Sequence, residues 1–317
     1  MILYALKRLG ALLPTILVPM VLLFVLIRLA PGGPAGALLG DEATPEQIAE
    51  LEAQLGLNEP LWRQFLDFIS SLIRFDFGQS LFLHADVSSL VLGSLSVTAT
   101  FVLLSMLFAL VVAVVTATIA SRAHNGLIDR VLVGFAVIGN AIPSFWLAVI
   151  LVGVFAVQLR WFPVAGYVPV TEDAFAWAQH LALPVFCLGI LQAAELFRYA
   201  RASMLDSMRQ PFVTTARSLG ISDRDIQNHY VNRMTVVPVM TVFGLSLGTL
   251  LGGAVILETV FSLPGLGQLL LTAVQRRDYP LIQGCVFFIA LIMVLANLVV
   301  DLFYAVADPR IRYGKAA

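Results

Sequence analysis

The chain has 317 residues, of which 59% are hydrophobic and only 12% are charged. A soluble domain carries about 25% charged residues, so this composition excludes an ordinary soluble protein and favours a chain whose main solvent is the lipid bilayer. The net charge of −1 gives no general reason to expect a nucleic-acid partner. Cys187 and Cys285 both lie in apolar stretches and do not indicate a disulfide framework.

Six windows are long and apolar enough to cross a bilayer, since a spanning helix needs about 20 largely apolar residues. Backbone groups must be satisfied internally in lipid, and no alternating pattern suggests a barrel, so helices are expected. The sequence therefore predicts an all-α polytopic membrane protein with six transmembrane helices. The predicted spans are residues 9–29, 95–120, 131–157, 180–199, 235–257 and 280–306.

Residues 1–30 form the N-terminal segment and the first predicted span. Basic residues followed by an apolar run also resemble a secretory signal peptide. The run from Leu9 to Leu29 is longer than the apolar core of such a peptide, which has roughly 7 to 15 residues. We therefore expect an uncleaved first span, with cleavage as the alternative.

Residues 31–94 form a long connection that we expect to fold as a small cap outside the membrane. Thr44 supplies an N-cap, Pro45 a first helical residue and Gln47 a capping-box partner, which predicts one helix. Apolar residues then recur at helical spacing, which predicts a second helix on or near the membrane surface whose aromatic residues serve in packing. These residues are Leu61, Phe65, Phe68, Ile69 and Leu72.

Residues 95–306 form a predicted core of five spans, followed by a tail over residues 307–317. Basic residues indicate the orientation, because they concentrate in cytoplasmic connections. If the N-terminus is cytoplasmic, 13 of the 19 lysines and arginines fall on the inner side, six of them around one connection. We therefore expect both termini in the cytoplasm.

The basic inner connection, residues 201–234, carries its own helical pattern. Apolar residues recur at i, i+4 and i+7, a glycine follows where a left-handed C-cap is expected, and a serine can cap the next helix. The sequence therefore predicts a helix, a glycine turn and a second helix. The residues of this pattern are Phe212, Ala216, Leu219, Gly220 and Ser222.

Motifs for catalysis are absent from the sequence. The only lysines, Lys7 and Lys315, do not belong to a phosphate-binding P-loop, so nucleotide hydrolysis must come from another protein if it occurs. There is no H-E-x-x-H or G-x-S-x-G motif, and the four histidines are scattered without ligand spacing. We therefore expect no enzymatic activity and no catalytic, cofactor-binding or metal site in this chain.

Several motifs, taken in chain order, resemble one transporter family. The chain is similar to the permeases of ABC importers in the dipeptide, oligopeptide and nickel transport group. The resemblance runs from the first span to the C-terminus, and the ordered set is more specific than any one motif. The motifs occupy residues 55–60, 76–80, 142–147, 201–206, 212–220, 232–238, 258–267, 277–280 and 308–310.

The resemblance implies a type I ABC importer transmembrane domain, multi-pass in the cell inner membrane, that forms half of the pathway for dipeptides or oligopeptides. The external cap is similar to that of the first of the two permease subunits. The implied partners are a second permease, two cytoplasmic ATPase subunits and an extracytoplasmic substrate-binding protein, with no nucleic acid. ATP and magnesium would be used by the ATPases, and this chain would bind neither.

The resemblance also makes the helix that ends at Gly220 the coupling helix, which docks in a groove of an ATPase. The broader importer signature, Glu-Ala-Ala followed after three residues by Gly, is only partly kept, because Thr214, Thr215 and Ala216 lead it. The alternative is that the apolar stripe packs against the chain's own helices. The candidate coupling residues are Phe212, Thr215, Ala216, Arg217, Leu219 and Gly220.

A second group of residues could line or gate the pathway. Pro143 releases a backbone carbonyl and could let the third span bend, although a static kink is equally compatible. A proline and glycines after Glu258 suggest a tight turn in a re-entrant or external hairpin. The candidates are Asn140, Pro143, Ser144, Glu258, Pro264 and Gly265.

Other functions stay open at this point. The same architecture could import nickel, glutathione or another small solute, because the motifs report coupling rather than cargo. An ion-coupled carrier that works alone is less favoured, since such carriers need several midplane carboxylates or broken repeated helices. DNA binding by the basic segment is disfavoured because predicted spans lie close on both sides.

Overall fold

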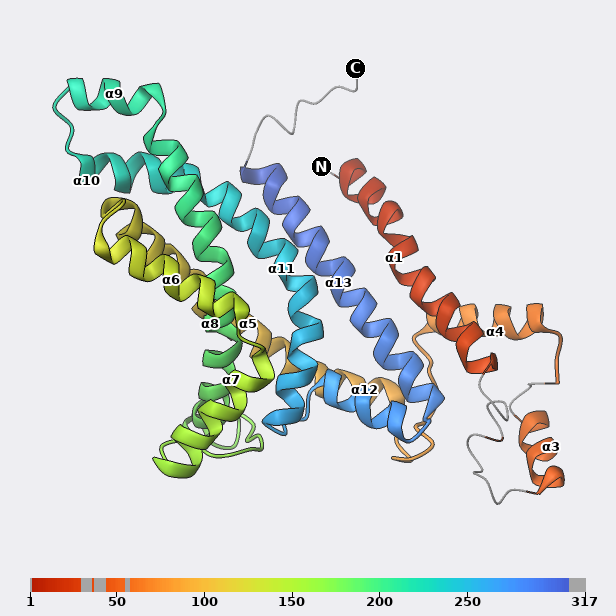
Figure 1. The fold of residues 1–317 in the computed structure, drawn as a ribbon. Coiled ribbons are helices and arrows are strands. Elements are labelled where there is room, and N and C mark those ends of the chain that lie inside the picture. The colour runs from red at the N-terminus through yellow and green to blue at the C-terminus, as the bar shows by residue number, and fades with distance from the viewer. Residues whose placement is uncertain (1, 30–35, 37–43, 55–57, 308–317) are drawn as a thin grey trace. The chain divides into compact units, whose positions relative to one another are not determined.

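The computed structural model describes residues 2–29, 36, 44–54 and 58–307. These residues form helices and connecting turns, and within the described ranges the only β-pairing is an isolated bridge between Gln79 and Asp86 (Figure 1). The all-α prediction is confirmed. The domain boundaries proposed above stay predictions, and the tail over residues 308–317 lies outside the described residues.

Helices follow one another throughout the described part of the chain. They are α1 (Ile2–Leu29), α3 (Pro45–Gln54), α4 (Leu61–Arg74), α5 (Val87–Arg122), α6 (Leu127–Ala141), α7 (Ser144–Leu151), the π-helical η1 (Val152–Gln158), α8 (Ala174–Met208), α9 (Pro211–Ser218), α10 (Asp223–Asp225), the π-helical η2 (Ile226–Val231), α11 (Asn232–Val260), α12 (Leu266–Gln275) and α13 (Tyr279–Ala307).

Four described helical stretches are long and apolar enough to cross a membrane. They are Val87–Arg122, Ala174–Met208, Asp223–Leu247 and Tyr279–Val299, and they overlap the second, fourth, fifth and sixth predicted spans. The third predicted span falls on Leu127–Ala141 and Ser144–Gln158, which are bent by 104° and count as a fifth crossing if they form one span. The total of six spans and the cytoplasmic termini stay predictions.

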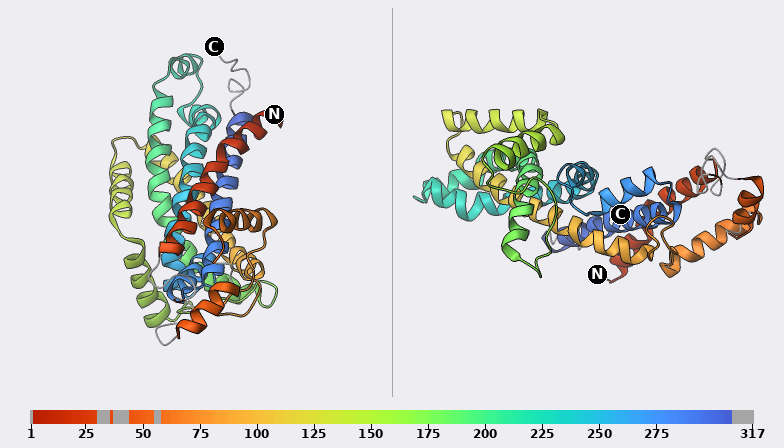
Figure 2. Two further views of the ribbon diagram at one scale, coloured as in Figure 1. Left: turned by 90° about the vertical axis from the view of Figure 1, so that its right-hand side faces the viewer. Right: turned by 90° about the horizontal axis from the view of Figure 1, so that it is seen from below.

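The chain divides into two compact units. Figure 2 shows their helices in two further views. One unit comprises residues 1–97 and 264–295, and the other comprises residues 98–263 and 296–317, so α5 and α13 contribute to both.

Aromatic side chains build the core of the first unit. The ring of Phe24 on α1 lies 5.3 Å from the ring of Phe65 and 5.3 Å from that of Phe68, both on α4. The predicted packing role of these aromatics is therefore confirmed. Leu61 is the first residue of α4, as its place in the helical repeat predicts, and its side chain is exposed.

The capping prediction for α3 is also confirmed. The backbone N–H of Thr44 donates to Gln47 Oε1 at 3.0 Å, and the N–H of Gln47 donates to Thr44 Oγ1 at 3.4 Å. Each side chain thus satisfies a backbone donor that the first turn of the helix leaves without a partner.

Two of the sequence motifs meet in the first unit, although they lie far apart in the chain. The buried carboxylate of Asp278 accepts hydrogen bonds from Ser80 Oγ at 2.6 Å and from the backbone N–H of Phe82 at 3.1 Å. The same carboxylate accepts from the N–H of Leu281 at 3.2 Å, in the first turn of α13. Asp278 therefore joins the loop before α5 to the beginning of α13.

Small side chains build the core of the second unit. Ala109, Ala113, Ala117 and Ala120 form a fully buried row on α5, in one apolar cluster with residues of α8. A Cβ atom added at Gly189 of α8 would lie 2.6 Å from Cδ1 of the Phe108 ring, so the backbone of α8 comes close to α5 here. Close approach through small residues is a common way for membrane helices to pack without a hydrophobic driving force.

Candidate functional site: a groove beside helix α9

The basic connection of the sequence folds as predicted into a helix, a glycine turn and a second helix. Pro211 occupies the first turn of α9, where its missing N–H costs nothing. Gly220 has a φ of +80°, which residues with a side chain rarely adopt, and the N–H of Ile221 donates to the carbonyl of Ala216 at 3.1 Å. Together these features end α9 and reverse the chain.

The second helix begins with the predicted cap but continues differently from a simple helix. Ser222 Oγ accepts from the N–H of Asp225 at 3.2 Å and donates to Asp225 Oδ2 at 2.6 Å. The three residues of α10 then pass into the π-helical η2, which leads directly into α11. The turn after α9 is therefore connected to a long apolar helix without a flexible linker.

One face of α9 is anchored in the second unit. Val213 is 1% exposed and Ala216 is 8% exposed, and both belong to the same apolar cluster as Ile226 and Val231. Arg217 Nε donates to Asp223 Oδ1 at 2.7 Å across the glycine turn. This exposed ion pair contributes little stability by itself, but together with the buried face it ties α9 to α10.

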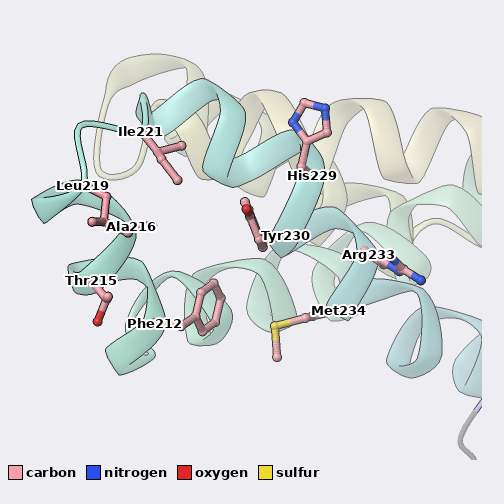
Figure 3. A pocket seen from close by; sticks show the side chains of 9 residues that line it. All are labelled: Phe212, Thr215, Ala216, Leu219, Ile221, His229, Tyr230, Arg233 and Met234. Carbon is pink, nitrogen blue, oxygen red and sulfur yellow. The ribbon is translucent and has the colours of Figure 1, made fainter.

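A groove of about 650 Å³ runs beside α9 and is mainly apolar (Figure 3). Side chains of α9 line one side of it, and side chains that follow the glycine turn line the other. The rings of Phe212 and Tyr230 face each other across it with their centroids 6.3 Å apart. The lining residues are Phe212, Thr215, Ala216, Leu219, Ile221, His229, Tyr230, Arg233 and Met234.

The structure brings the candidate coupling residues together but divides the apolar stripe. Ala216 packs against the chain's own core and Phe212 is half-buried against it, whereas Leu219 is 75% exposed. Thr215 and Arg217 are exposed. The chain's own core thus covers Ala216 and part of Phe212, as the alternative interpretation expects, and leaves Leu219 exposed.

A second cavity of about 520 Å³ lies on the other side of the same turn and is strongly basic. Its lining includes Asp223 and the buried Gln227, whose Oε1 has no hydrogen-bond partner among the described residues. The region around α9 thus offers an apolar groove and a cationic cavity next to each other. The basic side chains that line the cavity are Arg122, His124, Arg209, Arg217 and Arg224.

A partly buried ion pair, which was not predicted from the sequence, joins α6 to α8 near this region. Arg201 of α8 donates from Nε and Nη2 to the two carboxylate oxygens of Asp129 at 2.6 and 2.7 Å. The N–H of Asn125 also donates to Asp129 Oδ2 at 2.9 Å. The bidentate geometry fixes the first turn of α6 against α8. One signal was available, because both residues lie next to predicted span ends on the same side of the membrane.

Of the pathway candidates, Asn140, Pro143 and Ser144 surround the sharp bend between α6 and α7. Pro143 precedes α7 in extended conformation and separates two helices that are bent by 104°, a larger break than the expected bend within one span. Asn140 and Pro143 are exposed, and the carbonyl of Ser144 accepts from Cys187 Sγ at 3.6 Å. The bend is therefore held against α8.

The other candidates lie near the end of α11 and the beginning of α12. Glu258 is fully buried and accepts a hydrogen bond from Thr98 Oγ1. Gly265 is buried and precedes α12, a short apolar helix, while Pro264 is exposed. A short helix thus follows the predicted tight turn. Within the described residues, no group of three or more metal-ligating side chains is present.

Long apolar helices and a row of small residues between them are typical of a polytopic membrane protein. Comparison with known proteins identifies its family. Residues 109–313 match the binding-protein-dependent transport system inner membrane component, and residues 1–118 match the N-terminal family of the same membrane components. The chain belongs to this family and is a multi-pass permease of the inner membrane.

Named relatives cover nearly the whole chain. A "Probable peptide ABC transporter permease protein" of Sinorhizobium fredii is 38% identical over 310 residues, which cover 98% of this chain and 99% of the relative. The "Glutathione transport system permease protein GsiC" of Escherichia coli K12 is 37% identical over 310 residues, which cover 98% and 99%. A Brucella abortus protein, named as a candidate peptide transport system permease, is 37% identical over 308 residues, which cover 97% and 98%.

Proposed function

We propose that this permease forms half of the translocation pathway of an ABC importer for short peptides, as the first of two different permease subunits. The names of full-length relatives support a peptide cargo. The N-terminal family match, which includes the connection between the first two predicted spans, supports the assignment to one type of permease subunit. The proposed second permease completes the pathway.

We further propose that α9 couples this pathway to a cytoplasmic ATPase subunit. The observation that carries the proposal is the division of α9 into a buried face and an exposed face. Val213 and Ala216 anchor the helix, while Leu219 projects beside the groove. A short helix anchored in this way transmits a displacement of its partner to α8 and α11 instead of absorbing it.

The partner surface that fits this region is apolar at its centre and acidic at one edge. Leu219 and the groove would receive an apolar side chain, and the neighbouring basic cavity would attract carboxylates. ATP and magnesium would be bound by two such ATPase subunits and not by this chain. ATP binding moves the permease only if the ATPases contact α9 differently in their open and closed states.

A substrate-binding protein outside the membrane would deliver the cargo, as the family description implies. Glutathione is the second candidate cargo, favoured by the name of the Escherichia coli relative. Glutathione is itself a tripeptide, so both candidates belong to one chemical class. Nickel import and ion-coupled transport have less support, because the three relatives described above are named for peptide or glutathione transport.

Reconstitution of the complete complex tests the proposed function. Proteoliposomes that contain both permeases, with ATPases and binding protein present, should accumulate a labelled dipeptide or glutathione only when ATP and magnesium are supplied. Accumulation of nickel but neither peptide would contradict the cargo. Uptake by this chain alone, driven by an ion gradient, would contradict the ATPase partnership.

A further inference from the structure

Helix α4 has an apolar stripe that the core of its own unit does not cover. Phe68 and Leu72 turn into the aromatic core and are buried. Trp62, Leu66 and Ile73 are 65%, 56% and 74% exposed. The helix is therefore apolar beyond the face that its protein contacts require.

The apolar stripe lies between the core-facing side and the charged side of α4. At about 100° per residue, Trp62, Leu66 and Ile73 fall in one narrow row, which lies beside the core-facing side and not opposite it. The charged residues Arg63 and Asp67 are exposed on the remaining side. Helix α4 thus has one side for protein, one apolar side and one charged side, as expected of a helix that lies at the boundary between protein, lipid and water.

Contacts with α1 fix the position of α4 along the length of α1. Arg28, in the last turn of α1, donates from Nε and Nη2 to Gln64 Oε1 at 3.0 and 2.7 Å. Its guanidinium carbon lies 3.4 Å from the centroid of the Phe24 ring, which also packs against α4. Figure 1 shows α4 crossing the C-terminal end of α1. Helix α4 is therefore attached where α1 ends.

The exposed surface of α1 indicates whether lipid or water surrounds the end of this helix. Leu22, Leu26 and Leu29 are exposed apolar side chains that lead along α1 toward its last residue. In a membrane protein such a surface faces hydrocarbon, and it ends where the helix meets the headgroups. Because α4 is attached to this end of α1, its exposed apolar stripe is expected near the same headgroup boundary, where tryptophan is enriched.

From these contacts we propose that Trp62, Leu66 and Ile73 insert into the headgroup and acyl-chain boundary of the bilayer, so that α4 anchors the connection after α1 to the membrane surface. The occupant of the stripe is lipid, not a protein partner. The proposal rests on the membrane location of the chain and is independent of its cargo and of the ATPases. Its failure would therefore leave the proposed transport function untouched.

Spin labels at two adjacent exposed residues test the proposal. Leu66→Cys and Asp67→Cys are made separately in the full chain, with the native cysteines Cys187 and Cys285 replaced by alanine. The chain is labelled, assembled with its transporter partners and reconstituted in lipid. Collision of each label with oxygen, which concentrates in lipid, and with a water-soluble nickel chelate is measured by electron paramagnetic resonance.

The label at residue 66 should collide with oxygen several-fold more often than with the nickel chelate, and the label at residue 67 should show the opposite preference. A label at residue 66 that prefers the nickel chelate would place the stripe in water and overturn the proposal. A label there that is immobile and shielded from both reagents would show that a protein covers the stripe, which also overturns it. The label at residue 67 verifies in each case that α4 has kept its helical orientation.

Discussion

Replacement of Leu219 by alanine separates docking of α9 from folding of the permease. The side chain is 75% exposed, so Leu219→Ala leaves the chain's own core unchanged. Full burial of a leucine contributes about 1.5–3 kcal/mol, of which about 1–2 kcal/mol remains to be gained when a partner covers Leu219. We therefore expect the affinity for the ATPase subunit to fall about 5- to 30-fold.

The assay is binding of the purified ATPase subunit to the permeases in lipid nanodiscs, combined with ATP-driven uptake. Two matched variants on α9 serve as controls. Thr214→Ala changes an exposed residue that does not line the groove, so affinity should stay within about twofold. Val213→Ala creates a cavity at a buried anchor and should lower the free energy of unfolding by about 2 kcal/mol.

Docking through Leu219 would be contradicted if Leu219→Ala left the affinity for the ATPase subunit unchanged while Thr214→Ala weakened it. Such a result would mean that the other face of α9 contacts the ATPase. A loss of affinity accompanied by an equal loss of permease stability would also contradict docking through Leu219, because it would show that Leu219 belongs to the fold and not to the interface.

Three further substitutions address the ion pair of Asp129, the glycine turn after α9 and the residue before α12. Asp129→Asn removes the carboxylate that pairs with Arg201 and should lower the free energy of unfolding by about 2 kcal/mol, as measured by thermal unfolding in detergent. Addition of Arg201→Met should recover part of this loss. A stability equal to that of the natural chain would exclude the pair as a structural link. Gly220→Pro cannot keep the φ of +80° and should uncouple ATP hydrolysis from uptake while the complex still assembles; normal uptake would contradict the rigid link. Gly265→Leu should abolish uptake at normal complex levels in the membrane, since Gly265 is buried at the start of α12; uptake equal to that of the natural chain would remove Gly265 from the gate candidates.

Periodicity in the sequence was enough to predict the elements around α9. A proline, an apolar residue every turn and a glycine with a capping serine are local signals, and local geometry obeys them. Periodicity could not show which part of the stripe the chain itself covers. Ala216 and Leu219 lie on one predicted face. Ala216 belongs to an apolar cluster with residues of η2 and α11, whereas Leu219 is exposed.

The break at Pro143 and the ion pair of Asp129 show two other limits of the sequence. A proline indicates that a helix is interrupted, but the size of the bend depends on what the two halves pack against. Asp129 and Arg201 each looked like an isolated charge at the end of a predicted span. Their pairing is set by the packing of α6 against α8, which no local pattern of residues encodes.

The carboxylate of Asp278 has a consequence for motion in the first unit. It binds the loop before α5 and the first turn of α13 at once, through Ser80, Phe82 and Leu281. Opening a gap between these two helix ends would leave a buried charge without its donors, which is costly in a membrane protein. In a transport cycle the two ends should therefore travel as one body, and any entrance that opens and closes must form along other helix edges.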